Sequence, residues 1–423
     1  MVLGFPGSTD RYMSSWGVQQ TMDITNTIRI EARTKKQEIM KDAMRSSDKI
    51  RIQYASKYSR SANYWKYSIG QNKQLKALGV VEEKQALEAK LSNWISAKPQ
   101  REEQYGQALS LLEESYHALE EYEVLYSYFI ETVYTGAEIY RLGMRSNKLL
   151  SALEKEDKEA IEEATESMKD YLPDFYKDYN KPLDKKLFVA TMNMYRDNLD
   201  KKFHPGFFSD VDEKYDGSFE KYADYVYGES ILVDQDAFMK FLKRPKAKKI
   251  SDDPGLKIMQ DIRQVFGAQQ QMNYGSIMKQ QKGKRLFVAA LIEMQSDQEH
   301  YPDANSTMRF TYGKVGDYEP RDGVLYKYYT TLEGVMEKED PDDDEFIVSP
   351  KLKRLYQNKN YGRYGHNGTM PVCFTTDNDI TGGNSGSPVI NGKGHLIGTA
   401  FDGNWEAMSG DIKFEDELQK CIN

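Results

Sequence analysis

A serine flanked by glycines near the C-terminal end is the clearest chemical feature of this sequence. Residues 382–388 read Gly-Gly-Asn-Ser-Gly-Ser-Pro, with the central serine at position 385. Glycines on both sides let the backbone turn sharply and leave the Ser385 hydroxyl with little steric cover. Such a turn also directs backbone N–H groups into one concavity, as an oxyanion hole requires. The run predicts a nucleophile loop, with an incidental serine in a glycine-rich turn as the structural alternative.

A serine nucleophile needs a histidine to accept its proton and usually a carboxylate to orient that histidine. The candidates are His117, His204, His300, His366 and His395. We expect His117 on a helix surface and His204, His366 and His395 in turns or loops. None has a sequence neighbourhood typical of a catalytic base. The sequence therefore predicts that the base and the orienting carboxylate lie outside this chain, N-terminal to Met1.

The composition is that of a water-exposed globular chain. The 423 residues predict two domains, and the net charge of −8 argues against a nucleic-acid partner. No run is long and apolar enough to predict membrane insertion, and no spacing predicts a metal or another cofactor. We expect Cys373 and Cys421 to be buried thiols. The N-terminus does not match a signal peptide, and both ends have the pattern of truncations.

Hydrophobic periodicity divides the chain into three segments. Residues 1–20 begin with a strand, residues 21–300 are largely helical, and residues 301–423 are rich in strands. We expect Pro99 to end a helix. Apolar residues at helical spacing include Leu87, Leu91, Trp94 and Ile95, then Leu109, Leu112, Tyr116 and Leu119. The later strands are expected within residues 308–312, 326–331, 371–376, 389–391 and 396–401. This order predicts an α+β fold in which helices are inserted between strands.

Five longer motifs resemble the bacterial dipeptidyl-peptidase VII and XI family, and the resemblance spans most of the chain. They are Gly-Phe-Pro-Gly-Ser-Thr-Asp-Arg-Tyr (4–12), Ala-Asn-Tyr-Trp-Lys (62–66), Tyr-Pro-Asp-Ala-Asn-Ser-Thr (301–307), Asp-Ile-Thr-Gly-Gly-Asn-Ser-Gly-Ser-Pro (379–388) and Phe-Asp-Gly-Asn-Trp-Glu-Ala-Met-Ser-Gly-Asp (401–411). The resemblance implies a chymotrypsin-like double β-barrel with a large inserted helical domain, of which only part of the barrel is present here.

The resemblance also implies roles for individual residues. Ser385 matches the nucleophile, and the N–H groups of Gly383 and Ser385 match the oxyanion hole. Asn63 and Asp402 match residues that hold the α-amino group of the substrate. Gly403 matches the position that carries arginine in the subtype that cuts after Asp or Glu. Glycine there implies the other, dipeptidyl-peptidase VII-like subtype, with a bulky apolar P1 residue.

The function that the resemblance implies is a serine exopeptidase that releases dipeptides from peptides with a free N-terminus. It also implies a homodimer in the periplasm or on the outer surface of a Gram-negative bacterium. Because the catalytic His and Asp are expected elsewhere, the fragment itself is expected to be inactive. The alternative is a non-enzymatic helical binding or scaffold module with a vestigial serine loop.

Overall fold

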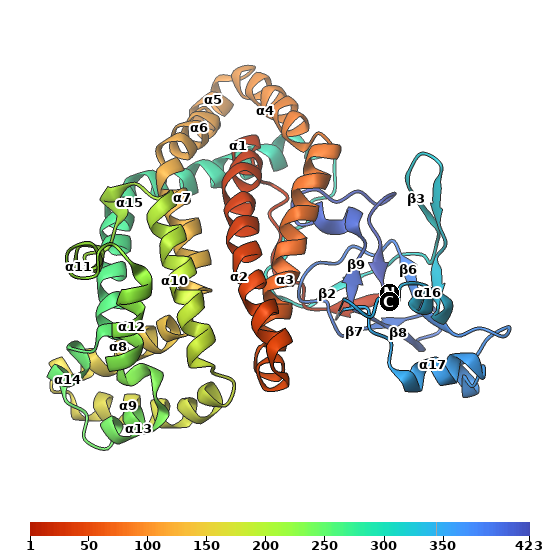
Figure 1. Cartoon of the computed structure of the whole chain (residues 1–423). Coiled ribbons are helices and arrows are strands. Elements are labelled where there is room, and N and C mark those ends of the chain that lie inside the picture. The colour runs from red at the N-terminus through yellow and green to blue at the C-terminus, as the bar shows by residue number, and fades with distance from the viewer. Residues whose placement is uncertain (344) are drawn as a thin grey trace. The chain divides into compact units, whose positions relative to one another are not determined.

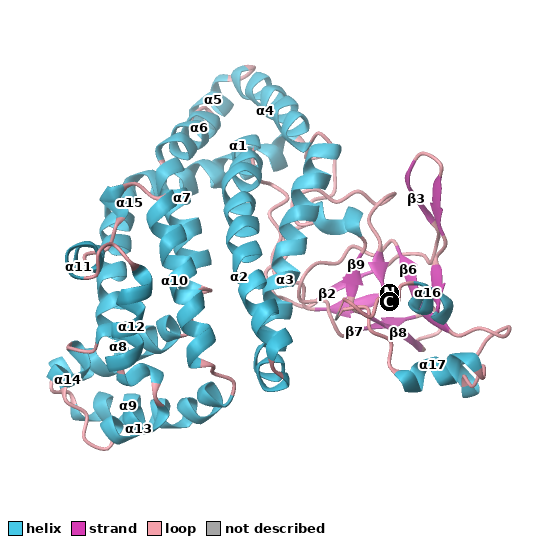
Figure 2. Cartoon of the chain, in the orientation of Figure 1, coloured by secondary structure: helices cyan, strands magenta, loops and turns pink. Residues whose placement is uncertain are grey.

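The computed structural model describes residues 1–343 and 345–423, which form two compact units. The sheet unit holds Met1–Met13, Gly70–Lys84 and Gln295–Asn423. The helical unit holds Ser14–Ile69 and Gln85–Met294. The sheet unit therefore includes Gly70–Lys84, a stretch inside the helical segment predicted at 21–300. Figures 1 and 2 show the helices and strands that make up these units.

Most of the chain is helical. The longer helices are α2 (Asn26–Ser46), α3 (Asp48–Ala77), α4 (Val80–Ser96), α6 (Ala108–Ala118), α7 (Glu120–Tyr128), α8 (Ile139–Glu154), α9 (Lys158–Lys177), α10 (Lys181–Asn198), α11 (Phe207–Lys214), α12 (Phe219–Glu229), α13 (Gln235–Leu242), α15 (Pro254–Met294) and α17 (Pro350–Gln357). Shorter ones are α1 (Ser15–Gln20), α5 (Pro99–Tyr105), α14 (Ala247–Ser251) and α16 (Leu332–Glu337). Two π-helical turns, η1 (Thr21–Thr25) and η2 (Phe129–Tyr134), and four 3₁₀ turns, η3 (Lys201–Phe203), η4 (Ile231–Val233), η5 (Gly362–Tyr364) and η6 (Trp405–Ser409), complete the described set.

Local sequence sets several helix ends. Asp157 and Asn180 each precede a helix and accept a backbone N–H of its first turn, from Ala160 and Leu183 respectively. The expectation for Pro99 was wrong in part: α4 ends at Ser96, and Pro99 is the first residue of α5. The first helical position suits proline because its missing N–H has no acceptor there.

A large apolar core holds the helical unit together. In this unit α15 packs against α6 and α8, and α10 packs against α2 and α12 (Figure 1). Fully buried aromatic side chains at this core include Tyr140, Phe188, Tyr195, Phe207, Phe219 and Phe238. The buried carboxylate of Asp184 accepts hydrogen bonds from the hydroxyls of Tyr227 and Tyr179 at 2.8 and 3.2 Å. Tyrosines of this unit thus contribute both buried rings and hydrogen-bonded hydroxyls to the core.

The sheets are small and antiparallel. The strands are β1 (Val2–Gly4), β2 (Arg309–Thr311), β3 (Tyr318–Arg321), β4 (Val324–Tyr326), β5 (Tyr329–Thr331), β6 (Pro371–Thr376), β7 (Ser387–Ile390), β8 (Leu396–Ala400), β9 (Asp402–Gly403) and β10 (Cys421–Ile422). One sheet has the order β2-β1-β7-β8, a second has the order β5-β6-β10-β9, and β3 pairs with β4. The mixture of helices and antiparallel sheets confirms the α+β class.

The first strand joins strands that come much later in the sequence. Val2 pairs with Thr311 of β2 and with Val389 of β7. The intervening helices therefore lie, in chain order, between strands of one sheet. One residue each from β1, β7, β8 and β10 forms a buried cluster: Val2, Val389, Ala400 and Cys421.

Candidate active site

The predicted nucleophile loop lies between β6 and β7, and its backbone requires glycine. Gly383 and Gly386 have φ angles of +106° and +88°, a region that side chains strongly disfavour. A Cβ atom on Gly383 would lie 2.4 Å from the carbonyl oxygen of Phe5. Gly383 therefore serves both the turn and its close approach to the N-terminal segment, whereas Gly386 serves the turn alone.

The N–H groups of this loop fall into two sets. The N–H of Asn384 donates to the carbonyl of Thr381 at 3.1 Å, and that of Gly386 donates to Ala400 at 2.8 Å. Within residues 1–343 and 345–423, the N–H groups of Gly383 and Ser385 donate to no acceptor. These two donors are thus available to an incoming oxyanion.

Ser385 itself is exposed and only loosely held. Its Oγ lies 3.5 Å from the carbonyl oxygen of Phe401, at the long limit for a hydrogen bond. The hydroxyl can therefore rotate toward a base or a substrate at little cost. The arrangement offers a nucleophile beside two free donors.

Asn384, for which the sequence predicted no role, supports the loop from inside. Its side chain is buried, and its Oδ1 accepts the N–H of Thr381 at 3.1 Å. Its carbonyl accepts the N–H of Ser387 at 2.9 Å. The signal that could have identified it was an amide side chain directly before the serine, where a tight turn needs a local acceptor.

None of the five histidines hydrogen-bonds Ser385 in the part of the chain that the structure describes. The rings of His204 and His300 bond the carbonyls of Leu199 and Gln295 at 3.0 and 2.9 Å. The remaining three lie where they were expected: His117 lies in α6, His366 in a turn bridged to Thr369, and His395 in the turn between β7 and β8.

Asp402 and Gly403 form the short strand β9, which pairs with β10. Asp402 is exposed, and its Oδ1 accepts the N–H of Gly403 at 2.8 Å. A Cβ atom on Gly403 would lie 2.9 Å from the Cβ of Ala407. A larger residue at position 403 thus requires a shift of the turn that follows.

Asn63 belongs to the helical unit, where it lies exposed on α3. The residues around it on α3 contact a buried ionic cluster. The Nη1 of Arg33 donates to the carbonyl of Ser61 at 3.3 Å, and both Arg33 and Lys36 pair with Glu131 of η2 at 2.9 and 3.2 Å. Burial lowers the pKa of Lys36 to about 8, against the opposing effect of Glu131. This part of α3 is therefore anchored firmly within its unit.

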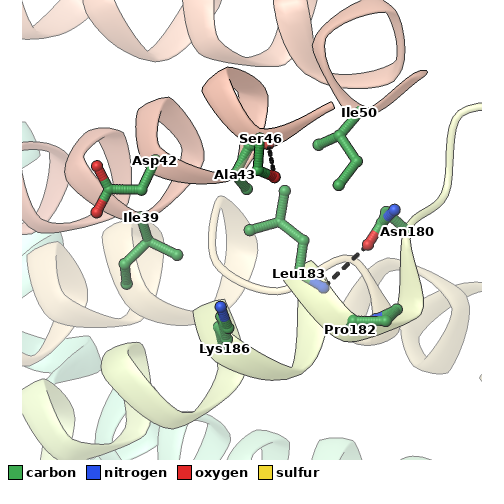
Figure 3. A pocket seen from close by; sticks show the side chains of 9 residues that line it. All are labelled: Ile39, Asp42, Ala43, Ser46, Ile50, Asn180, Pro182, Leu183 and Lys186. Atoms are coloured by element: carbon green, nitrogen blue, oxygen red, sulfur yellow. Dashed lines mark hydrogen bonds between the residues drawn. The ribbon is translucent and has the colours of Figure 1, made fainter. Parts of the chain in front are cut away.

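A pocket of about 370 Å³ opens in the helical unit (Figure 3). Its walls come from α2, the start of α3 and the start of α10. The lining residues are Ile39, Asp42, Ala43, Ser46, Ile50, Asn180, Pro182, Leu183 and Lys186. None of the predicted site residues is among them.

Two expectations concern metals and thiols. Among the described residues, no group of three or more His, Cys, Asp or Glu side chains is placed to hold a metal ion. Cys421 is buried, and burial raises the pKa of its thiol to about 11. Cys373 is only half-buried, so the expectation of two buried thiols was wrong for this residue. Its place on β6, near the edge strand β5, accounts for the exposure.

In the described residues, none of the helices has the length and apolar character needed to span a membrane.

Comparison with known proteins identifies the family to which the chain belongs. Residues 1–423 match the model of the family Peptidase S46, and the chain belongs to this family. The resemblance predicted from the five motifs is thereby confirmed.

The relatives include proteins with two different names, one of which states a specificity for Asp and Glu. Dipeptidyl-peptidase 7 of Phocaeicola vulgatus is 43% identical over 431 residues, an alignment that covers 100% of this chain and 58% of the relative. The Asp/Glu-specific dipeptidyl-peptidase of Porphyromonas gingivalis is 36% identical over 428 residues, covering 100% and 59%. The crystal structure of Porphyromonas endodontalis DPP11 in complex with the dipeptide Arg-Glu is similar with a TM-score of 0.87 and 31% identity, covering 100% and 60%. The chain spans about three fifths of the length of these relatives.

Proposed function

We propose that this chain carries the nucleophile of a serine exopeptidase that releases dipeptides from the free N-terminus of peptides. The observation that carries the proposal is the loop of Ser385, with the free N–H groups of Gly383 and Ser385, in a chain of the Peptidase S46 family. Attack of the Ser385 hydroxyl on the second peptide bond forms an acyl-enzyme and releases the remaining peptide. Water then attacks the acyl-enzyme and releases the dipeptide.

The catalytic base and its orienting acid belong, in this proposal, to sequence outside these 423 residues. Two observations support it: no histidine bonds Ser385 in the described residues, and the named relatives are longer than this chain. The chain alone is then inactive, and the longer protein that contains it is active.

Asn63 and Asp402 are proposed to hold the α-amino group of the substrate. Asp402 supplies an exposed carboxylate, and Asn63 supplies an exposed side-chain carbonyl. Both are acceptors suited to an ammonium group, and a charged acceptor gives the stronger hydrogen bond. Recognition of a free N-terminus would limit cleavage to peptide ends.

The P1 preference is proposed to be for a bulky apolar residue. Gly403 places no cation on the wall of the pocket, so an acidic P1 side chain would find no partner there. The relatives named dipeptidyl-peptidase 7 include one with 43% identity, compared with 36% for the Asp/Glu-specific relative of P. gingivalis. The absence of a cation at position 403 is the observation that supports the apolar preference, and the identities favour the dipeptidyl-peptidase 7 relatives over the Asp/Glu-specific one.

The architecture proposed for the whole protein is a chymotrypsin-like double β-barrel with the helices inserted. Support comes from the apolar side chains of Leu3, Phe5, Phe310 and Tyr312, which are 38–79% exposed on β1, β2 and the residues beside them. Such side chains suit a face that packs against further strands.

A homodimer in the periplasm or on the outer surface is proposed from the motif resemblance alone.

Turnover by the longer protein tests the proposed function. We expect cleavage of Xaa-Leu dipeptidyl reporters, and loss of activity by several orders of magnitude in Ser385→Ala. Reporters with a blocked N-terminus should not be cleaved. No turnover, together with an upstream sequence that lacks the His and Asp, would support the binding or scaffold module instead.

Substitution of Gly403 tests the P1 assignment. Gly403→Arg should reduce cleavage after Leu and increase cleavage after Asp or Glu, because it introduces a cation at this wall. Gly403→Ala is the matched control for crowding against Ala407, since it adds the Cβ without the charge. A wild-type preference for Xaa-Asp reporters would contradict the apolar assignment.

A further inference from the structure

An arginine near the N-terminus makes a two-pronged ion pair with the segment that leads into the nucleophile loop. The Nη1 and Nη2 atoms of Arg11 donate to Oδ2 and Oδ1 of Asp379 at 2.5 and 2.7 Å. Its Nε donates to the carbonyl of Gly410 at 3.0 Å. The side chains of Arg11 and Asp379 are 17% and 32% exposed, so water screens this pair only in part. All three residues belong to the sheet unit.

Arg11 is itself held from three directions. Its backbone N–H donates to Oδ1 of Asp303 at 2.9 Å, and its carbonyl accepts from Nζ of Lys84 at 2.5 Å. Its guanidinium lies over the ring of Phe414, 5.4 Å from the centroid. The backbone of Arg11 is therefore held by contacts that do not involve the loop, and its guanidinium contacts Phe414 in addition to Asp379.

The loop also bonds the two segments that Arg11 connects, namely the N-terminal segment and the segment at Gly410. The carbonyl of Gly382 accepts the N–H of Gly7 at 2.6 Å, four residues before Arg11. The hydroxyl of Thr381 donates to Asp411, the residue after Gly410. Arg11 thus connects Asp379, where the chain enters the loop, to the two segments that bond Thr381 and Gly382.

We propose that Arg11 is a positioning residue for the nucleophile loop. Its bidentate ion pair with Asp379 and its hydrogen bond to the carbonyl of Gly410 keep the N–H groups of Gly383 and Ser385 oriented for an oxyanion. This inference rests on the proposed function. A loop with glycine at 382, 383 and 386 has wide backbone freedom, so its donors are oriented only if the surrounding structure fixes them. Preorganised donors act mainly on the transition state, which places the effect in kcat.

Kinetics of the longer protein test this role. We expect Arg11→Gln to lower kcat about 100-fold, the scale of losing one oxyanion-hole donor, with KM changed less than threefold. Arg11→Lys should recover only part of the loss, because a point charge cannot reproduce the fork on Asp379. Arg321→Gln, at an exposed arginine of β3 in the same unit, is the matched control and should keep wild-type kcat.

A second measurement does not require turnover. In the 423-residue chain, Arg11→Gln and Asp379→Asn should each increase deuterium uptake in peptides covering 379–388 and leave the peptides of β2 unchanged. If Arg11→Gln does not fold, Asp379→Asn takes its place in both experiments, since it preserves the shape of the side chain.

The outcomes separate this inference from the proposed function. A wild-type longer protein that neither turns over nor reacts with a fluorophosphonate at Ser385 refutes the proposed function. An active wild type with a folded Arg11→Gln variant of unchanged kcat and unchanged loop exchange refutes the positioning role alone. A loss of activity that matches the unfolded fraction also refutes it, because a merely structural role predicts that match.

Discussion

The two units bury their apolar side chains to very different degrees. The helical unit encloses a continuous core rich in aromatic residues, including Phe188 and Phe238 at 0% exposure. The cluster beside β1, β7 and β8 comprises four buried residues, while Phe310 and Tyr312 of the same unit are 57% and 79% exposed. The helical unit is therefore stabilised mainly by burial. The sheet unit depends more on backbone pairing and on polar contacts such as the fork of Arg11 on Asp379.

The largest expected effect is in the helical core. Phe188→Ala should lower the free energy of unfolding of the helical unit by about 4 kcal/mol, because it removes a fully buried ring and leaves a cavity. Amide hydrogen exchange in peptides of α10 and α12, measured at increasing urea concentrations, gives this loss of free energy. A loss below about 1 kcal/mol would show that this core is not the main source of the stability of the helical unit.

A smaller effect is expected from the matched deletion in the sheet unit. Val389→Ala removes two methyl groups from the four-residue cluster and should cost about 2 kcal/mol. Exchange of the β7 and β8 amides should increase, with no change in the α10 peptides. An equal loss of protection in both units would show that they unfold together and would remove the contrast between them.

The smallest expected effect, counted per pH unit, is a dependence of the stability of the helical unit on pH. Burial, and next the Glu138 carboxylate, raise the pKa of Asp184 from its ordinary value of 3.8 to about 7. Between these two pKa values Asp184 is protonated in the folded state and ionised in the unfolded state. The free energy of unfolding therefore falls as the pH rises from about 4 to about 7. The slope from this group is at most about 1.4 kcal/mol per pH unit.

Urea unfolding of wild type and Asp184→Asn at pH 5 and pH 6.5 measures that slope. The amide does not titrate, so the variant should show a flatter dependence on pH. Identical slopes in the two proteins would mean that Asp184 titrates near its ordinary pKa in spite of its burial.

The sequence predicted helices and strands well wherever the apolar residues follow a single helical or strand period. The stripe of Leu109, Leu112 and Tyr116 lies in α6, and residues 371–376 form β6. Pro99 was misjudged because proline both ends and begins helices, and sequence periodicity alone does not distinguish these two roles. Boundaries were thus less predictable than the existence and type of the elements.

The candidate site was predictable only in its local part. Glycines around Ser385 indicate a sharp turn from sequence, and the structure gives positive φ to Gly383 and Gly386. The support from Arg11 could not be predicted, because it joins residues 368 positions apart through a contact that no local pattern encodes. Asn384 differs from Arg11, because its hydrogen bonds to Thr381 and Ser387 are local and only its burial is not encoded nearby in the sequence.

The pairing of β1 with β7 also bears on the order in which the molecule folds. Val2 pairs with Val389, so the sheet beneath the nucleophile loop closes across nearly the whole length of the chain. Closure of so long a loop is entropically costly, and contacts of this kind form late. During synthesis the helical unit is complete before β7 exists. We expect the serine loop, which needs Gly7 and Arg11 against it, to be among the last parts of the protein to reach its final geometry.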